Sequence, residues 1–185
     1  MKTLIYLMVF VFTITTQAQN VIELEEAVLF APNISKMLTQ EDYQSFIVTE
    51  KFRNDFSRDP IAFQRENFNI LEYINYFGDK KYDLYEVNFK SSNGRLEVQF
   101  DKNGKLLKNR QWFSNVELPG KIKHQLRNEH KGWIVVKNKY FSKGDGEMTD
   151  KIVYRIKLQN GNKTRNIRIL PDLQEEVVLA SKDQP

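Results

Sequence analysis

Two histidines are the first residues to test for chemistry, because imidazole serves both as a metal ligand and as a general base. His124 and His130 are the only histidines in the chain. They lie six positions apart, which puts them on different sides of a helix, whereas a helical metal pair needs a spacing of about three or four. The chain also has no cysteine, so disulfides, thiol catalysis and thiolate metal sites are excluded. These residue types predict no metal site.

The motifs of common catalytic and cofactor sites do not occur. The sequence has no Gly-x-Ser-x-Gly elbow, no Ser-x-x-Lys, no Walker phosphate loop and no paired-glycine dinucleotide pattern. Asp145, Glu147 and Asp150 are a potential calcium cluster, but their spacing does not fit the calcium-loop pattern, and an ordinary polar turn is the alternative. We therefore expect no catalytic residue and no cofactor. An enzyme with an unrecognised site stays as the last of three hypotheses.

Positive charge is the feature that points to a partner. Residues 20–101 contain nine Lys and Arg against fifteen Asp and Glu, whereas residues 102–168 contain seventeen against five. A basic half favours an anionic partner, such as an acidic protein, a charged glycan or lipopolysaccharide, through steering and salt-sensitive contacts. The alternative is that Lys and Arg are scattered over solvated strand faces, where they only provide solubility.

A predicted helix carries part of this charge and supplies the candidate binding residues. Leu118-Pro119 opens this helix and Gly132 ends it. Trp112 and Phe113 come shortly before it and are candidate aromatic contacts, with the core as the alternative place for Trp112. The candidate cations are Lys121, Lys123, Arg127 and Lys131.

The clearest structural signal is a hairpin that continues into a third strand. Residues 85–90 and 95–100 alternate apolar and polar side chains on either side of a turn over residues 91–94, which predicts two half-buried antiparallel strands. Asn103-Gly104 then predicts a second tight turn. The chain returns through Leu106, Leu107 and Trp112. We expect a three-stranded meander.

The same pattern returns in the second half. Residues 154–159 overlay on residues 85–90, and this overlay places Phe100 on Ile169. A helical segment precedes each copy, which predicts two related helix-plus-meander halves. A strand is predicted over residues 133–140 after the second helix, whereas none is predicted directly after the first. The predicted fold class is α+β, with antiparallel meanders and helices packed on one face of the sheet.

The rest of the chain is assigned around this core. Asp59-Pro60 predicts the start of the first helix, with aspartate as its cap, and Gly78 its end. Upstream, residues 19–59 are predicted as an N-terminal extension, with strands over 20–30 and 43–51 and a polar connector through Arg53, Phe56 and Arg58. A helix is the alternative for the first of these strands, because Glu25-Glu26-Ala27 also suits one. Residues 60–171 form the predicted domain, with a long turn over 142–150. Residues 172–185 are predicted as an acidic tail.

The first eighteen residues predict export. Lys2 precedes an apolar run from Leu4 to Phe12, and Thr16-Gln17-Ala18 presents small residues where a signal peptidase reads them. We expect a signal peptide cleaved after Ala18 and a periplasmic or extracellular mature protein. No later stretch is apolar enough to predict a membrane span.

These features together resemble a known family. The Tyr85-x-Val-x-Phe strand, the strand ending in Asp101-x-Asn-Gly-Lys-Leu-Leu107 and the helix leading to Gly132-Trp133 resemble the PepSY-like and beta-lactamase-inhibitor-like family of small exported bacterial domains. The resemblance covers roughly residues 60–171. It implies an exported, non-catalytic α+β domain that binds or inhibits other proteins through its sheet or hairpin loops.

The leading functional hypothesis is therefore an exported binding or inhibitor-like protein whose partner is another exported or envelope protein. The alternative is an envelope component that binds anionic glycan or lipopolysaccharide by charge. Neither hypothesis involves nucleic acid. Raised salt separates the two, because a contact made by charge alone is screened, whereas a shape-complementary interface persists.

Overall fold

The computed structural model describes residues 20–22, 31, 34–40, 43–76 and 82–172, and these form one mixed sheet with helices. The strands are β1 (Asn20–Ile22), β2 (Ile34–Gln40), β3 (Tyr43–Val48), β4 (Leu84–Ser91), β5 (Gly94–Asp101), β6 (Leu106–Ser114), β7 (Ile134–Asp145), β8 (Lys151–Asn160) and β9 (Lys163–Ile169). The helices are the 3₁₀ helix η1 (Glu50–Phe52), α2 (Arg53–Arg58), α3 (Pro60–Asn67), α4 (Ile70–Tyr76) and α5 (Gly120–Glu129).

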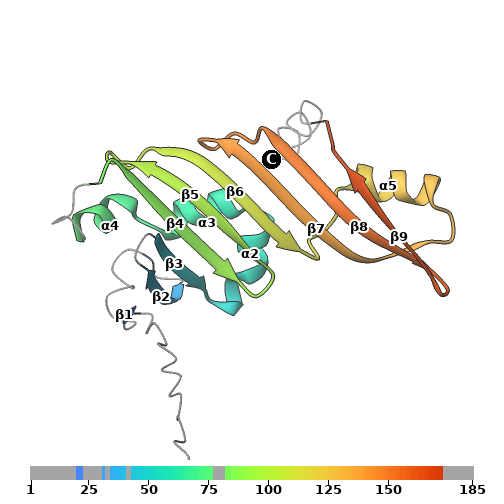
Figure 1. Ribbon diagram of the computed structural model, residues 1–185, viewed down its shortest axis with the longest axis horizontal. Coiled ribbons are helices and arrows are strands. Elements are labelled where there is room, and N and C mark those ends of the chain that lie inside the picture. Colours follow the sequence, from blue (N-terminus) through green and yellow to red (C-terminus); the bar gives the residue numbers. More distant parts are fainter. Residues whose placement is uncertain (1–19, 23–30, 32–33, 41–42, 77–81, 173–185) are drawn as a thin grey trace, which may run out of the picture.

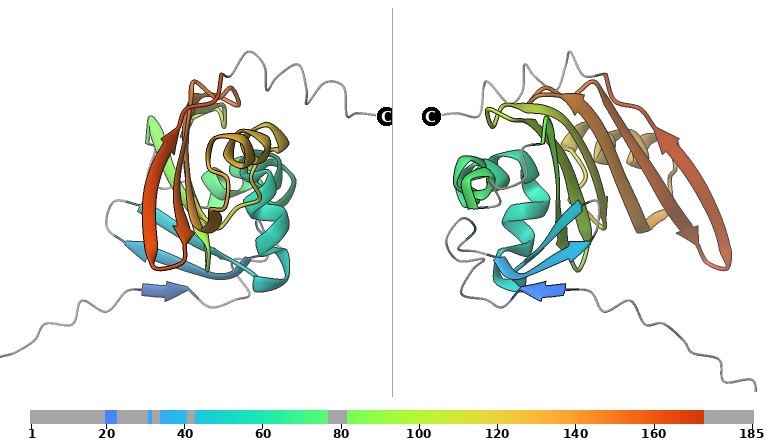
Figure 2. Two further views of the ribbon diagram at one scale, coloured as in Figure 1. Left: turned by 90° about the vertical axis from the view of Figure 1, so that its right-hand side faces the viewer. Right: turned by 60° about the vertical axis from the view of Figure 1, so that its left-hand side comes forward.

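The strands lie in the sheet in chain order, from β1 to β9 (Figure 1). Every neighbouring pair is antiparallel except β3 and β4, which run parallel because the helices η1 to α4 connect them. The helices lie on one face of the sheet, and no described helix covers the other face (Figure 2, left). The predicted α+β fold with a mainly antiparallel sheet is confirmed.

Two hydrophobic clusters fill the space between the sheet and the helices. The first lies under α2 to α4 and is rich in aromatic rings: Phe68 meets Phe89 edge-on at 5.2 Å between ring centroids. Burial at this cluster raises the pKa of the Tyr73 hydroxyl. The second cluster lies under α5, where Ile122 and Leu126 pack against apolar residues of β8. The helices lie on this face because their apolar side chains pack against it in the two clusters.

The hairpins β4–β5 and β8–β9 have the same register. Tyr85 lies opposite Phe100, and Tyr154 lies opposite Ile169, so the overlay predicted from the sequence superimposes both strands of each hairpin. From these pairs the register continues without a shift to a two-residue turn in each hairpin. A common origin of the two halves by duplication stays a prediction.

The position beside β4, where no strand was predicted, is occupied by β3. This strand pairs in parallel with β4, and Phe46 lies opposite Phe89 with their rings stacked at 5.5 Å. In the second half, the place beside β8 is taken by β7, which follows its helix. A strand from the predicted N-terminal extension therefore completes the first half of the sheet.

The first helix begins as predicted but does not continue unbroken. The Asp59 side chain accepts a hydrogen bond from the Ala62 amide at 3.0 Å, which confirms the predicted cap. The helix is interrupted at Phe68, whose extended backbone places its ring in the first cluster, and Asn69 caps the next helix by accepting from the Glu72 amide at 3.3 Å. The prediction of one continuous helix was wrong because core packing of Phe68 outweighs helix continuity.

Two connections also differ from the prediction. The predicted polar connector is the helix α2, which buries Phe56 completely in the first cluster. The predicted turn over 142–150 is shorter, because β7 continues to Asp145 by pairing with β6. The start of β7 is exposed, with Ile134 64% exposed, because β6 pairs with β7 only from Lys139 onward.

Several predictions fall outside the described residues. These are the signal peptide and its cleavage after Ala18, the predicted strand beyond Ile22, the helix end at Gly78 and the tail beyond Asp172. Among the helices that the structure does describe, none has the length and apolar character needed to cross a membrane.

Candidate functional site

The uncovered face of the sheet carries three rows of side chains that cross its strands. Side chains directly opposite each other on neighbouring strands point to the same face, so the strand register defines each row. The apolar row is Trp112, Phe141 and Val153. The first cationic row is Lys139, Arg155 and Arg168. It is displaced from the apolar row by two residues along the strands. The second cationic row is Arg110, Lys143 and Lys151. It is displaced from the apolar row by two residues in the opposite direction.

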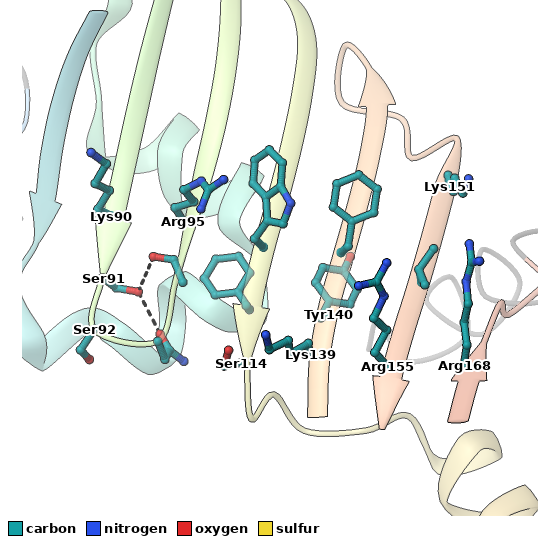
Figure 3. Close-up of a pocket in the computed structure, with 16 residues that line it drawn as sticks. Lys90, Ser91, Ser92, Arg95, Ser114, Lys139, Tyr140, Lys151, Arg155 and Arg168 are labelled. Carbon is teal, nitrogen blue, oxygen red and sulfur yellow. Dashed lines mark hydrogen bonds between the residues drawn. The ribbon is translucent and has the colours of Figure 1, made fainter. Parts of the chain in front are cut away.

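A groove of about 850 Å³ follows the apolar row and ends at the β4–β5 turn (Figure 3). The described residues that line it include six cations and no carboxylate. The cations are Lys90, Arg95, Lys139, Lys151, Arg155 and Arg168. The close-up shows that they come from strands that are far apart in the sequence, from β4 to β9. Four of the six cations belong to the basic half of the chain, and Lys90 and Arg95 belong to the acidic half.

The floor of the groove is aromatic and fixed by its neighbours. The guanidinium of Arg95 lies over the Trp112 ring at 4.1 Å from its centroid, and Phe141 lies on the next strand at 5.4 Å. Arg95 also donates to Glu97 at 3.0 Å, which holds the guanidinium in place. Val153 is buried on this face, with 5% exposed. The groove thus combines an apolar centre with one wall formed by the first cationic row, while Lys151 is the residue of the second row that lines it.

The first cationic row places like charges directly opposite each other. Arg155 lies opposite Lys139 on β7 and opposite Arg168 on β9. None of these three forms an ion pair with any carboxylate in the part of the chain that the structure describes. Like charges opposite each other on a sheet destabilise it. The free protein therefore holds positive charge that an anionic ligand would neutralise.

The cations predicted from the sequence lie elsewhere. Lys121, Lys123 and Arg127 are exposed on α5, and Lys131 follows the end of this helix, also exposed. Because α5 covers the other face of the sheet, the structure does not bring these residues together with Trp112 (Figure 2, left). The Lys123 ammonium donates to Glu117 at 2.7 Å, and this hydrogen bond and the lysine charge lower the pKa of the glutamate.

The two predicted aromatic contacts separate onto opposite faces, as neighbours on a strand must. Trp112 is half-buried on the uncovered face. Phe113 is 2% exposed and packs edge-on against Phe56 at 5.3 Å, although its edge also reaches the end of the groove. We therefore assign Phe113 to the core and keep Trp112 in the candidate site.

Of the three acidic residues considered as a calcium cluster, Glu147 uses its carboxylate in an ion pair with Arg65 of α3 at 2.8 Å. The backbone amide of Asp150 donates to the Lys143 carbonyl at 2.9 Å and closes the loop. No group of three His, Asp or Glu side chains suited to a metal ion occurs among the residues that the structure describes.

Sequence reasoning missed the groove because its cations never form a run. On β8, Lys151 and Arg155 alternate with buried apolar residues, as on any solvated strand face. The signal that was available is the phase of the alternation: Trp112, Phe141 and Val153 each stand between two polar or cationic residues of the same face. Only the strand order shows that these positions are neighbours.

Comparisons with protein-family models, with curated proteins and with solved structures found no match to this chain.

Proposed function

We propose that the chain is a non-catalytic binding protein that holds an acidic segment of another exported protein on the uncovered face of its sheet. The observation that carries this proposal is the groove with six cations, no carboxylate among its described lining residues and an apolar floor. Because the sequence predicts export, we expect the partner in the periplasm or outside the cell.

The apolar centre favours a protein partner over a ligand bound by charge alone. Protein interfaces have an apolar core with a polar rim, and Trp and Arg are enriched among the residues that dominate their affinity. The apolar row with its two cationic rows has this arrangement, with Trp112 under Arg95 in the floor.

The dimensions suggest the shape of the segment. The two cationic rows lie four residues apart along a strand, which is about 13 Å, and an α-helix with its side chains is about 10–12 Å wide. The groove extends from β4 to β9, which is about 24 Å or about sixteen residues of helix. An amphipathic helix with an apolar stripe on the apolar row would direct acidic flanks at both cationic rows.

A pair of synthetic peptides tests this proposal with the full chain. The first is an amphipathic peptide of about sixteen residues with a Leu and Phe stripe flanked by Glu; the second has the same composition in scrambled order. We expect the amphipathic peptide to bind about tenfold more tightly in fluorescence anisotropy at moderate salt, because only this peptide buries the apolar row. Equal, salt-labile binding of both peptides would contradict the proposal and favour an anionic glycan or lipopolysaccharide.

Three variants locate the contact. The charge-reversed pair Lys139→Glu with Arg155→Glu should abolish binding, and Trp112→Ala should weaken it about tenfold or more. The matched control, Lys121→Glu with Arg127→Glu on α5, changes the net charge equally and should retain binding. The same variants, used as baits on envelope and culture-medium fractions, should separate a partner specific to the groove from proteins retained by net charge. Loss with the α5 control instead would move the site to the helix.

A further inference from the structure

A second cavity lies on the helix side of the sheet, where the two halves of the molecule meet. It has a volume of about 450 Å³, within the range of small-molecule sites. Its walls come from α2 and from the loop between β6 and α5, and its floor comes from Gln111, Tyr140 and Tyr154. We call this cavity the seam pocket, because Tyr140 packs against both hydrophobic clusters. Asn93 and Tyr140 also line the groove, but the other lining residues of the seam pocket are its own.

The seam pocket has no unbalanced charge. Its described lining includes one guanidinium and one carboxylate, those of Arg58 and Glu117. Arg58 donates to Asp55 at 2.8 Å, and Glu117 accepts from Lys123 at 2.7 Å, so each charge already has a counter-charge. This neutrality contrasts with the basic groove on the other face and favours an uncharged ligand.

Several amides in the lining have hydrogen-bonding capacity to spare. Gln111 is 5% exposed; its Nε2 donates to Asn109, and no described donor reaches its Oε1. The carbonyl oxygens of the Asn54 and Asn93 side chains accept from neighbours, while their Nδ2 groups have no acceptor among the described residues. A pocket with both donors and acceptors to offer suits hydroxyl groups, which both donate and accept.

The rim of the pocket is held in an unusual conformation. Asn115 has φ +56°, the left-handed region, and is the only described residue other than glycine with positive φ. Asn138 fixes this conformation, because its carbonyl accepts from the Asn115 amide at 2.9 Å and its side-chain amide donates to the Val116 carbonyl at 2.9 Å. Asparagine adopts this region more readily than most residues, so these hydrogen bonds hold the rim in one fixed turn.

The floor adds an aromatic ring. Tyr140 is half-buried, and its ring lies 5.3 Å from the ring of Tyr154, which is buried behind it with 5% exposed. Aromatic rings pack well against the apolar C–H face of a sugar, while amides bind its hydroxyls. We propose that the seam pocket binds a neutral sugar unit, held between the tyrosine floor and the amides of Gln111, Asn54 and Asn93.

The test is saturation-transfer NMR on the full chain with glucose, galactose, mannose and N-acetylglucosamine as probes and with glucuronate and glucosamine as charged comparisons. We expect at least one neutral sugar to receive saturation, with stronger binding than either charged sugar. Gln111→Leu, which keeps the shape but removes the acceptor, should weaken this sugar about tenfold. The matched control Gln99→Leu lies on the uncovered face and should leave binding unchanged.

A second variant, at an exposed residue, keeps the proposal testable if the substitution of the buried Gln111 prevents folding. Asn54→Ala removes an amide from the exposed side of α2, and it should also weaken binding of the sugar. No saturation of any neutral sugar, equal binding of the charged sugars, or unchanged affinity in both Gln111→Leu and Asn54→Ala would overturn the proposal. Because neither substitution touches the groove, binding of the acidic peptide should persist in both variants.

Discussion

At the scale of single residues, Gly144 is the described glycine with the least room for a side chain. It is buried in β7, and a Cβ atom placed there would overlap the backbone carbonyl of Met148 and approach the Asn109 side chain at 3.0 Å. We expect Gly144→Ala to lower the free energy of unfolding by about 1–3 kcal/mol, because the backbone of the turn must move to admit the methyl group. Urea denaturation of the full chain measures this change.

Gly120 provides the control for that substitution. It is the first residue of α5, and an added Cβ would meet nothing within 4 Å. Gly120→Ala should therefore leave stability unchanged or raise it by up to about 1 kcal/mol, because alanine loses less backbone entropy in a helix. Equal losses in both variants would show that the close approach at Gly144 does not determine the cost.

At the scale of elements, local signals predicted the hairpins well. The alternation around Tyr85 and Tyr154 and the turns that follow them need only neighbours in sequence, and both hairpins formed with the predicted phase. The cap at Asp59 was also predictable from the sequence, because a capping side chain binds the backbone of its own helix. What failed depended on tertiary contacts: the break at Phe68 and the burial of Phe56 in α2 are decided by the aromatic cluster that they enter.

The candidate site could not be predicted from local patterns, because it also depends on tertiary contacts. Arg155 and Arg168 belong to one hairpin, but Lys139 and Trp112 join them only through the pairing of β6, β7 and β8. The excess of Lys and Arg in the second half is a count from the sequence. The sequence analysis predicted binding residues on α5, where cations are close in sequence. The sheet register gathers a second set across the strands.

This arrangement of like charges predicts opposite effects on stability and binding. Arg155→Gln removes the central charge of the first cationic row, so the free protein should gain about 0.2–1 kcal/mol in free energy of unfolding at low salt, while the acidic peptide binds less tightly. The gain should shrink as salt is raised, because salt screens the repulsion between exposed charges. Denaturation at two salt concentrations measures the gain.

Arg127→Gln is the comparison within the same protein. Arg127 lies in the last turn of α5, where a positive charge complements the helix dipole, so its removal should lower stability slightly, by about 0.3–1 kcal/mol at low salt. Peptide binding should not change. A stability loss in Arg155→Gln similar to that in Arg127→Gln would mean that the row carries no repulsion.

At the scale of the whole molecule, the question is whether the two hydrophobic clusters fold as one unit. Each cluster has its own helices, but β6 and β7 pair continuously from Lys108 to Ser114, and Tyr140 and Val116 pack against both clusters. The sheet and these two side chains should couple the halves. We therefore expect a single cooperative unfolding transition.

The two tryptophans of the chain allow a direct measurement, because they report on different halves. Trp133→Phe leaves Trp112 on β6, and Trp112→Phe leaves Trp133, which packs against the second cluster. Fluorescence of both variants should give the same denaturant midpoint after correction for the stability of each variant. Leu126→Ala, which removes a buried side chain of the second cluster, should cost about 2–5 kcal/mol and move both signals together. If Leu126→Ala shifted the Trp133 signal and left the Trp112 signal in place, the halves would be separate folding units, and the seam pocket would lie at a boundary that opens independently.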